Sequence, residues 1–385
     1  MSGARPARDG ADAGPDAGEA HRVGPPPGEL GRRVLHVARS AGALLFTLLV
    51  TFAGLLLVTF VIGRVVPIDP VLAILGDRAT EAQIAATREA LGLNEPLWVQ
   101  FAVYVGDVVR GDFGQSLVTS RPVIEDVARV LPATLELATI AIVIGVSLGV
   151  PLGVASAARR GSWVDQVARV VGLIGYSTPI FWLGLLGLMV FYGRLGWVGG
   201  PGRLSTSLEF VYDLEVTTRT GAILIDSALS GAWDVFRNAL SHVVLPAALL
   251  GYYSLAYIAR MTRSFMLEQL GRDYVMAARV KGVPEWRVVW VHALGNAWVP
   301  LVTVIALSYA SLLEGSVLTE TVFAWPGLGL YITNALLNAD MAAVLGGTVV
   351  VGTAFIGLNL MSDAIYRLGD PRARRTNTRL VRARW

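Results

Sequence analysis

The serine and glycines at positions 145–149 are residues whose type and spacing could perform covalent chemistry. Gly145, Ser147 and Gly149 fit the Gly-x-Ser-x-Gly pattern with which many hydrolases present a nucleophilic serine. That pattern works only on a strained turn from strand to helix with a histidine beside it. Here it lies within an apolar run, in which Gly145, Gly149 and Gly153 recur every four residues. Because small residues at that spacing let helices pack closely in lipid, the run favours helix packing over a membrane hydrolase using Ser147.

The lysine, cysteine and histidine content limits phosphate and metal chemistry. A phosphate-binding P-loop needs Gly-Lys followed by Ser or Thr, but Lys281 is the only lysine and it follows Val280. The sequence contains no cysteine, and no two histidines pair at metal-ligand spacing. The histidines are His21, His36, His242 and His292. We therefore expect no cofactor, no metal site and no enzyme activity; if transport uses ATP, another polypeptide hydrolyses it.

A short helix is predicted over residues 273–282, inside a basic segment (260–300) between two apolar runs. Asp273 suits the positive end of a helix dipole, and Lys281 suits the negative end. Gly282 can adopt the left-handed conformation that ends a helix, and Pro284 prevents its continuation. The helix is therefore short and has a defined end.

One face of this helix carries small side chains. Spacings of three and four residues place a common set on that face, namely Tyr274, Ala277, Ala278 and Lys281. Alanines allow a partner's backbone to come close, so the face suggests a helix that docks into another protein. An ordinary membrane-surface loop helix explains the same pattern and stays open as the alternative.

Carboxylates within the apolar runs are few. Glu136 and Asp363 lie near the ends of their runs, and Glu314 lies deeper. Charged residues within a membrane usually mark function, so Glu314 is a candidate for the transport pathway. Pairing with a neighbouring subunit explains Glu314 equally well. The series of carboxylates that a proton-coupled carrier needs is missing.

The elements that hold these residues must lie in a membrane. The 385 residues are 54% hydrophobic and 16% charged, with a mean hydropathy of +0.57, whereas soluble domains carry about 25% charged residues. The net charge of +3 is modest and clustered in a few loops. That pattern is typical of topology signals and not of nucleic-acid binding.

Six apolar runs are long enough, at about 20 residues, to cross a bilayer. They cover residues 40–63, 135–158, 170–192 with Pro179 inside, 239–258, 300–317 entered from about 294, and 342–364. Basic residues flank each expected inner loop, so both termini are predicted on the cytoplasmic side. The sequence thus predicts an all-α integral membrane protein with six transmembrane helices.

The chain divides into five expected regions. Residues 1–30 are a disordered cytoplasmic tail rich in Pro, Gly and Ala. Residues 31–63 hold the first transmembrane helix, and 64–130 form an extracytoplasmic cap with helical patches at 81–91 and 97–109. Residues 131–370 hold five transmembrane helices, a long outer loop at about 200–235 and a surface or re-entrant segment at 316–329. Residues 371–385 form a basic cytoplasmic tail.

Several stretches, in order, resemble the permeases of binding-protein-dependent ABC importers, and more narrowly the B-type subunit of dipeptide and oligopeptide importers. They are LGLNEPLWVQF (91–101), RGDFGQSL (110–117), LPATLELA (131–138), GVPLGVASAARRGSWVDQVAR (149–169), STPIFWLGLL (177–186), SHVVLPA (241–247), ARMTRSFMLEQLGRDYVMAARVKG (259–282) and ETVFAWPGLG (320–329). The resemblance runs from about residue 40 to about 372. Met276, His292 and Gly295 depart from the general importer pattern, which has Glu, Ile and Pro there.

The resemblance implies a fold like that of type I ABC importer permeases, with a cytoplasmic coupling helix that docks into an ATPase. The implied coupling residues are Asp273, Tyr274, Ala277, Ala278, Arg279, Lys281 and Gly282. The implied partners are a homologous second permease in a heterodimer, two cytoplasmic ATP-binding subunits and an extracytoplasmic solute-binding protein. The implied location is the cytoplasmic membrane of a bacterium or archaeon.

Two transport alternatives remain at this point. A stand-alone ion-coupled carrier would work without ATPase partners, although the sequence shows no internal repeat. A permease of the same family could also carry nickel or another small solute, because selection in such systems depends largely on the binding protein.

Overall fold

The computed structural model describes residues 29–65, 70–76 and 79–369. Of the expected disordered tail 1–30, residues 1–28 lie outside the described residues, as does the basic tail 371–385, whereas Glu29 and Leu30 begin a helix. The chain divides into two compact units, with the boundary between Thr51 and Phe52. In the described ranges the chain is helical, with one isolated β-bridge and no strand. The all-α prediction is therefore confirmed.

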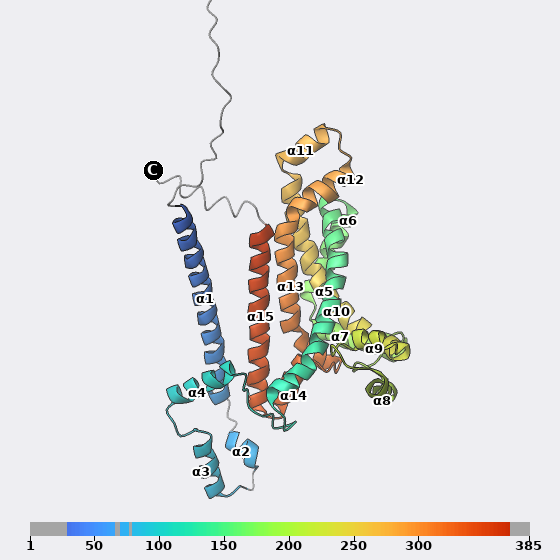
Figure 1. The fold of residues 1–385 in the computed structure, drawn as a ribbon. Helices are drawn as coiled ribbons and strands as arrows, with labels where there is room; N and C mark the ends of the chain where they lie inside the picture. The colour runs from blue at the N-terminus through green and yellow to red at the C-terminus, as the bar shows by residue number, and fades with distance from the viewer. Residues whose placement is uncertain (1–28, 66–69, 77–78, 370–385) are drawn as a thin grey trace, which may run out of the picture. The chain divides into compact units, whose positions relative to one another are not determined.

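The long apolar helices are labelled in Figure 1. They are α1 (Glu29–Val65), α5 (Val123–Ala158), α10 (Trp233–Leu270), α13 (Leu294–Val322) and α15 (Met341–Gly369), with α12 (Glu285–Arg287) and the π-helix η2 (Val288–Ala293) leading into α13. Among the residues that the structure describes, five helices are long and apolar enough to cross a membrane, and a bent pair makes a sixth span if it is counted as one. The six-span prediction holds on that count.

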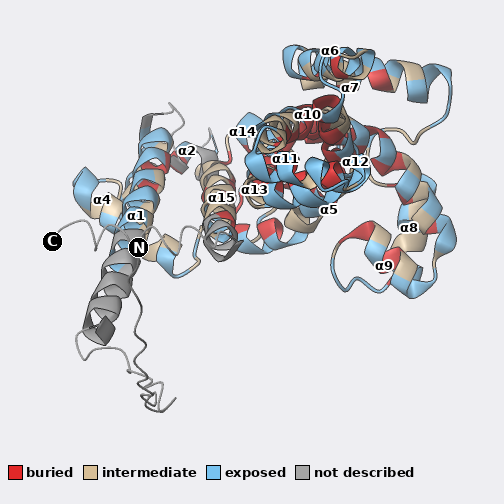
Figure 2. Cartoon of the chain, turned by 90° about the horizontal axis from the view of Figure 1, so that it is seen from above, coloured by how far each residue is buried: buried red, intermediate tan, exposed pale blue. Residues whose placement is uncertain are grey.

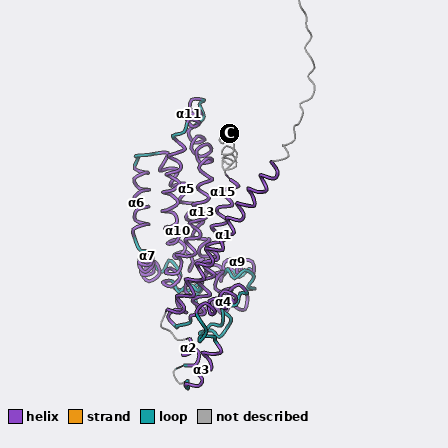
Figure 3. The backbone as a smooth tube through the Cα atoms, turned by 90° about the vertical axis from the view of Figure 1, so that its left-hand side faces the viewer, coloured by secondary structure: helices purple, strands orange, loops and turns teal. Residues whose placement is uncertain are grey.

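The bent pair stands where residues 170–192, interrupted by Pro179, predict the third span. It consists of α6 (Trp163–Ser177), followed by α7 (Ile180–Gly187) and the π-helix η1 (Leu188–Arg194), and the two halves meet at 97°. Pro179 disfavours the helical conformation for the residue before it, and Thr178 is accordingly extended, with φ −95° and ψ 128°. Figure 3 shows α6 running alongside α5 and α10 before the chain turns away at α7.

Several other boundaries differ from the sequence prediction. The second span begins as α5 at Val123 and not at 135, so the end of the expected cap 64–130 belongs to α5, and the fourth begins as α10 at Trp233 and not at 239. The fourth span continues as α10 to Leu270, so the first part of the basic segment is helix and not loop. The fifth begins at Leu294 as expected, but η2 and α12 extend the helical path back to Glu285. Of the expected surface or re-entrant segment 316–329, residues 316–322 form the end of α13, and a turn over 323–327 leads to α14 (Leu328–Leu337).

Shorter helices occupy the connections. The expected cap helices appear as α3 (Glu81–Ala90) and α4 (Leu97–Val109), preceded by α2 (Pro70–Leu75). The long loop holds α8 (Thr206–Glu215) and α9 (Ile223–Ser230), and the basic segment holds α11 (Asp273–Val280). Within the second unit, the α1 side chain Thr59 forms a 2.9 Å hydrogen bond with Tyr104 of α4, and Phe60 packs edge-on against Phe101.

The centre of the bundle is the contact between α5 and α10. Figure 2 shows that the buried residues concentrate around α10, next to α5 and α13. A Cβ placed on Gly145 would lie 2.5 Å from Ser254 Oγ, and one on Gly153 would lie 2.6 Å from the Ala259 carbonyl oxygen. Because the contacts advance in the same direction along both helices, α5 and α10 run parallel. The packing role predicted for the glycine series is confirmed, which accounts for the Gly-x-Ser-x-Gly match.

The Gly153→Ala substitution is expected to destabilise the protein by about 1–3 kcal/mol, the usual cost of forcing a methyl group into a filled core. A detergent-solubilised thermal unfolding curve would show a lower midpoint. Gly357→Ala on α15 is the matched control, because no atom lies within 4 Å of an added Cβ there. Equal midpoints for the two variants would contradict the packing role of Gly153.

A buried carboxylate joins the start of α14 to α5 and α13. Glu320 is fully buried, and its side chain accepts hydrogen bonds from Thr134 Oγ1 (2.7 Å) and from the Gly329 backbone N–H (2.7 Å). Trp325, also fully buried, donates its indole N–H to the Ala133 carbonyl at 2.9 Å. The segment after α13 is therefore a tightly held turn at the end of the bundle that lies away from α11.

Candidate functional site

The helix α11 lies past the end of α10, where it contacts η2 (Figure 1). Within α11 only Val275 is buried. Asp273, Tyr274 and Ala277 are exposed, and Ala278 is partly buried. The helix is thus fixed to the bundle by one apolar side chain and presents the rest of its surface.

The end of α11 is closed by a Schellman motif, in which two backbone N–H groups past the helix bond to its last carbonyls. Val283 N–H donates to the Ala278 carbonyl at 3.1 Å, and Gly282 N–H donates to the Arg279 carbonyl at 3.0 Å. Gly282 has φ +74°, in the left-handed region. The left-handed glycine predicted from the sequence is confirmed. Lys281 precedes it as the C-cap residue and is exposed.

Polar contacts fix α11 against its neighbours. Arg279 forms a two-pronged ion pair with Glu285 of α12, at 2.6 and 3.1 Å, and Glu285 holds the pKa of Arg279 above its ordinary value through these hydrogen bonds. Tyr274 donates its hydroxyl to Gln269 Oε1 at 3.0 Å. Arg279 and Tyr274 therefore support the position of α11 within the chain.

Apolar exposure on α11 reveals two residues that the sequence analysis did not select. Met276 is 62% exposed and Val280 is 82% exposed. They are four residues apart, so they lie on one face of the helix. An exposed apolar face of this kind usually marks a site where a partner binds. The sequence already contained a signal for this face, because Met276 and Val280 are apolar residues four positions apart.

The structure does not bring Glu314 to the buried polar groups. Glu314 is exposed on α13, on the same face as Ser311 and Leu318. No hydrogen bond or ion pair joins it to any other described residue, so the structure leaves open both roles considered for it.

A cluster around Asp165 was not predicted. Asp165 is fully buried and accepts hydrogen bonds from Ser156 Oγ at 2.6 Å and from Gly161 N–H at 3.0 Å. Arg263 of α10 donates from Nε at 2.7 Å and from Nη2 at 3.1 Å, and Arg169 donates at 2.9 Å. One carboxylate thus ties together the end of α5, the turn after it, α6 and α10. The Asp165–Arg169 spacing of four residues was the only sequence signal.

The Asp165 cluster and α11 lie at the same end of the bundle. Arg263 lies about two helical turns before Leu270. There α10 ends and the chain passes into α11. The residue that connects α10 to α5 and α6 therefore lies close to the point where the chain enters α11. The site as a whole is an exposed helix next to a buried ionic cluster.

Comparison with known proteins identifies the family. Residues 149–375 match the model of the binding-protein-dependent transport system inner membrane component, and residues 33–138 match the N-terminal model of the same membrane components. The probable D,D-dipeptide transport system permease of Escherichia coli K12 is 44% identical over 84% of this chain and 94% of that protein. The di/tripeptide transport system permease of Pseudomonas aeruginosa is 43% identical, over 88% of this chain and 98% of its own length.

A solved structure, the MetNI methionine ABC transporter in inward-facing conformations, aligns with 62% of this chain and 93% of its own chain, with a TM-score of 0.45 and 18% identity. The family models together with the curated relatives cover nearly all of the bundle and the α11 loop. This chain belongs to the family of inner membrane components of binding-protein-dependent transport systems, the permease subunits of ABC importers.

Proposed function

We propose that this permease carries dipeptides or short oligopeptides and that α11 is its coupling helix. The relatives named above are permeases of dipeptide and di/tripeptide systems, which supports a peptide cargo. The partners are a homologous second permease in a heterodimer, two ATP-binding subunits that receive α11, and a solute-binding protein at the opposite end. Glu314, on the exposed face of α13, is a candidate lining residue of the pathway.

The observation that carries this proposal is the surface of α11. Its exposed Met276 and Val280 form an apolar face, its small Ala277 and Ala278 allow close approach, and the Gly282 turn fixes where the helix ends. A few side chains that become buried at the centre of an interface carry most of the binding free energy. A helix with this surface fits a groove on an ATP-binding subunit.

The α11 end is proposed to face the cytoplasm. Arg159 and Arg160 in the turn after α5, together with Lys281 at the end of α11, place basic residues at that end. Cytoplasmic loops carry such an excess. On this assignment both chain termini are cytoplasmic, and the cap over residues 64–130 and the α8–α9 loop lie outside.

In this mechanism the ATP-binding subunits close on ATP and carry α11 with them. Rigid-body motions of packed helices are a common form of such switching. Because α11 follows α10 in the chain and Arg263 joins α10 to Asp165, α5 and α6 move as one body with α10. The bundle then alternates between openings on the two sides of the membrane.

Reconstitution of the chain in proteoliposomes with its second permease, ATP-binding subunits and binding protein tests this proposal. We expect dipeptide uptake that requires ATP and every partner. Val280→Glu should weaken recovery of the ATP-binding subunits with the permease at least about tenfold, because an unpaired charge in an apolar contact costs more than about 1.4 kcal/mol. Val109→Glu on α4 is the matched control, since Val109 is 78% exposed but belongs to the cap. Uptake driven by an ion gradient in liposomes that hold this chain alone would overturn the proposal.

A further inference from the structure

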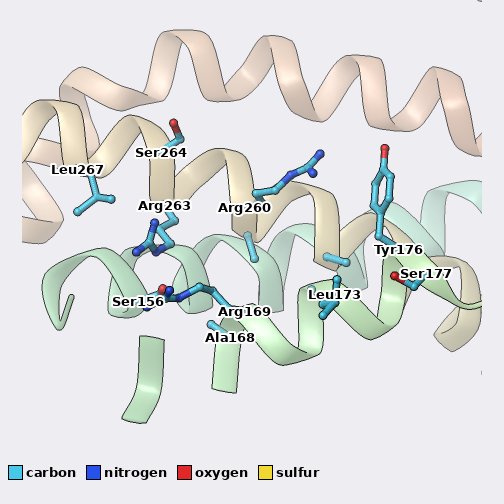
Figure 4. Close-up of a pocket in the computed structure, with 13 residues that line it drawn as sticks. Ser156, Ala168, Arg169, Leu173, Tyr176, Ser177, Arg260, Arg263, Ser264 and Leu267 are labelled. Atoms are coloured by element: carbon cyan, nitrogen blue, oxygen red, sulfur yellow. The ribbon is translucent and has the colours of Figure 1, made fainter. Parts of the chain in front are cut away.

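A cavity of about 730 Å³ lies between α6 and α10 (Figure 4). A second cavity of about 200 Å³ lies between α10 and α13, and Tyr176 at the end of α6 lines both. Because Tyr176 lines both, the two cavities are adjacent and follow one another along α10. They lead from Ser308 and Ser311 of α13 towards the α11 end.

The wall that α10 contributes is a single helix face. Tyr253, Tyr257, Arg260 and Ser264 follow one another at spacings of four, three and four residues, which places them in one row. Tyr253 and Tyr257 line the smaller cavity, and Arg260 and Ser264 line the larger one. This row therefore carries aromatic rings, hydroxyl groups and one cation.

Arg260 differs from the other two arginines of the larger cavity. Arg169 and Arg263 share the Asp165 carboxylate. Arg260 is exposed, and no carboxylate in the described part of the chain lies within ion-pair distance of it. Its guanidinium lies 4.9 Å from the ring centre of Tyr176 and 5.6 Å from that of Tyr257. Aromatic faces hold a guanidinium in place without neutralising it.

The picture of the site agrees with this arrangement. In Figure 4 the Arg260 and Tyr176 side chains extend to the same side, whereas Arg263 and Arg169 turn towards Ser156. Tyr176 also stacks on Tyr253, with ring centres 6.0 Å apart and planes inclined by 17°. The two tyrosines thus connect the cavities, and Arg260 stands where the row enters the larger one.

We infer that this row is the inner part of the transport pathway and that Arg260 binds the carboxylate of the passing peptide. The inference rests on the proposed function and adds the residues that the cargo meets. A guanidinium pairs with a carboxylate through two parallel hydrogen bonds, and the serine and tyrosine hydroxyls can exchange hydrogen bonds with peptide groups.

The length of the row favours passage over storage. From Tyr253 to Ser264 the helix rises about 16 Å, whereas an extended dipeptide spans about 7 Å. A dipeptide therefore reaches only part of the row at a time and moves along it by exchanging partners. Arg260, as the one cation in the row, is where its negative end is held before release at the α11 end.

The cysteine-free sequence permits a direct test in the reconstituted complex. Ser264→Cys and Ser311→Cys each place one thiol in a cavity wall, and Leu148→Cys, on the exposed face of α5, is the control. We expect a cationic, water-soluble thiol reagent to label the first two and to label the control far more slowly. A dipeptide should protect both cavity thiols. Labelling as slow as at Leu148→Cys, or no protection by the dipeptide, would overturn the inference.

The second arm addresses Arg260. Arg260→Gln should raise the dipeptide concentration needed for half-protection at least about tenfold, as expected for the loss of a charge-assisted hydrogen bond, and Arg260→Lys should restore most of the difference. The same dipeptide with an amidated carboxyl end should protect wild type and Arg260→Gln equally. If Arg260→Gln leaves the dipeptide concentration unchanged, Arg260 does not bind the carboxylate.

Two further outcomes separate the hypotheses. If the thiols are protected by added anionic phospholipid and not by dipeptide, the larger cavity is a lipid site and the inference is wrong. ATP-driven dipeptide uptake by the wild-type complex is measured in the same vesicles. When uptake occurs without thiol protection, only the pathway assignment fails; when the wild-type complex takes up no dipeptide, the proposed function fails as well.

Discussion

Asp165→Asn is expected to abolish ATP-driven transport and to lower the stability of the chain by about 3 kcal/mol. Removing one member of a buried charge cluster costs about 3–5 kcal/mol, because the remaining charge stays without compensation. We expect the lower end here, since the Arg263 and Arg169 side chains are 25% and 59% exposed. The substitution keeps the size of the side chain and removes only its charge. Thermal unfolding in detergent measures the first effect, and vesicle uptake measures the second.

The control for Asp165→Asn is a substitution in a solvent-exposed ion pair. Asp234 and Arg237 lie 4.0 Å apart, and both side chains are almost fully exposed. Exposed pairs contribute about 0–1 kcal/mol, so Asp234→Asn should leave the unfolding midpoint nearly unchanged. In the double variant Asp165→Asn/Arg263→Gln, part of the lost stability should return, because the unpaired cation is gone. A double variant as unstable as the sum of the two single variants would contradict a direct coupling of Asp165 to Arg263.

Gly282→Val is expected to reduce transport about thirtyfold while the protein still inserts in the membrane. At φ +74° a residue with a side chain costs about 1–2 kcal/mol, and a β-branched residue is least tolerated there. A cost of about 2 kcal/mol corresponds to about thirtyfold in an equilibrium constant. Apart from its chain neighbours, no described residue lies within 4 Å of a Cβ added at Gly282, so the effect of the Cβ arises from backbone conformation and not from a clash.

Two further substitutions isolate the role of the turn. Gly271→Ala, at the start of the same loop, is the matched control because Gly271 has φ −86° and no neighbour closer than 3.7 Å to an added Cβ. It should transport normally. Gly282→Asn should retain most activity, since asparagine tolerates the left-handed region. If Gly282→Val transports as well as Gly271→Ala, the position at which α11 ends does not matter for coupling.

Local physical chemistry made the helices and the α11 turn predictable. The number of residues needed to cross a bilayer, the effect of proline on its predecessor and the preference of left-handed turns for glycine all act within a few residues. For that reason the cap helices α3 and α4, the break at Pro179 and the closure at Gly282 follow from the sequence. The spacing of the glycines on α5 also predicted that they would pack against a neighbouring helix.

The predicted extent of several spans was wrong, because the apolar composition of a span does not show how far the helix continues beyond it. The residues from Arg260 to Leu270 read as a basic loop, yet they continue α10. Arg263 there is held by a buried carboxylate 98 residues earlier in the chain. A polar segment next to a membrane span remains helical when distant partners take up its charges.

The sequence by itself determined the class of the protein, its helical spans, its family and the short helix at which we propose it meets its ATPases. Only the tertiary structure decided which charges are buried together and which stay exposed: Asp165 with Arg263 in one cluster, Arg260 over two tyrosine rings, and Glu314 on an open helix face. The physical reason is range. Turn geometry and hydropathy depend on neighbouring residues, whereas the pairing of a charge depends on which helices pack beside it.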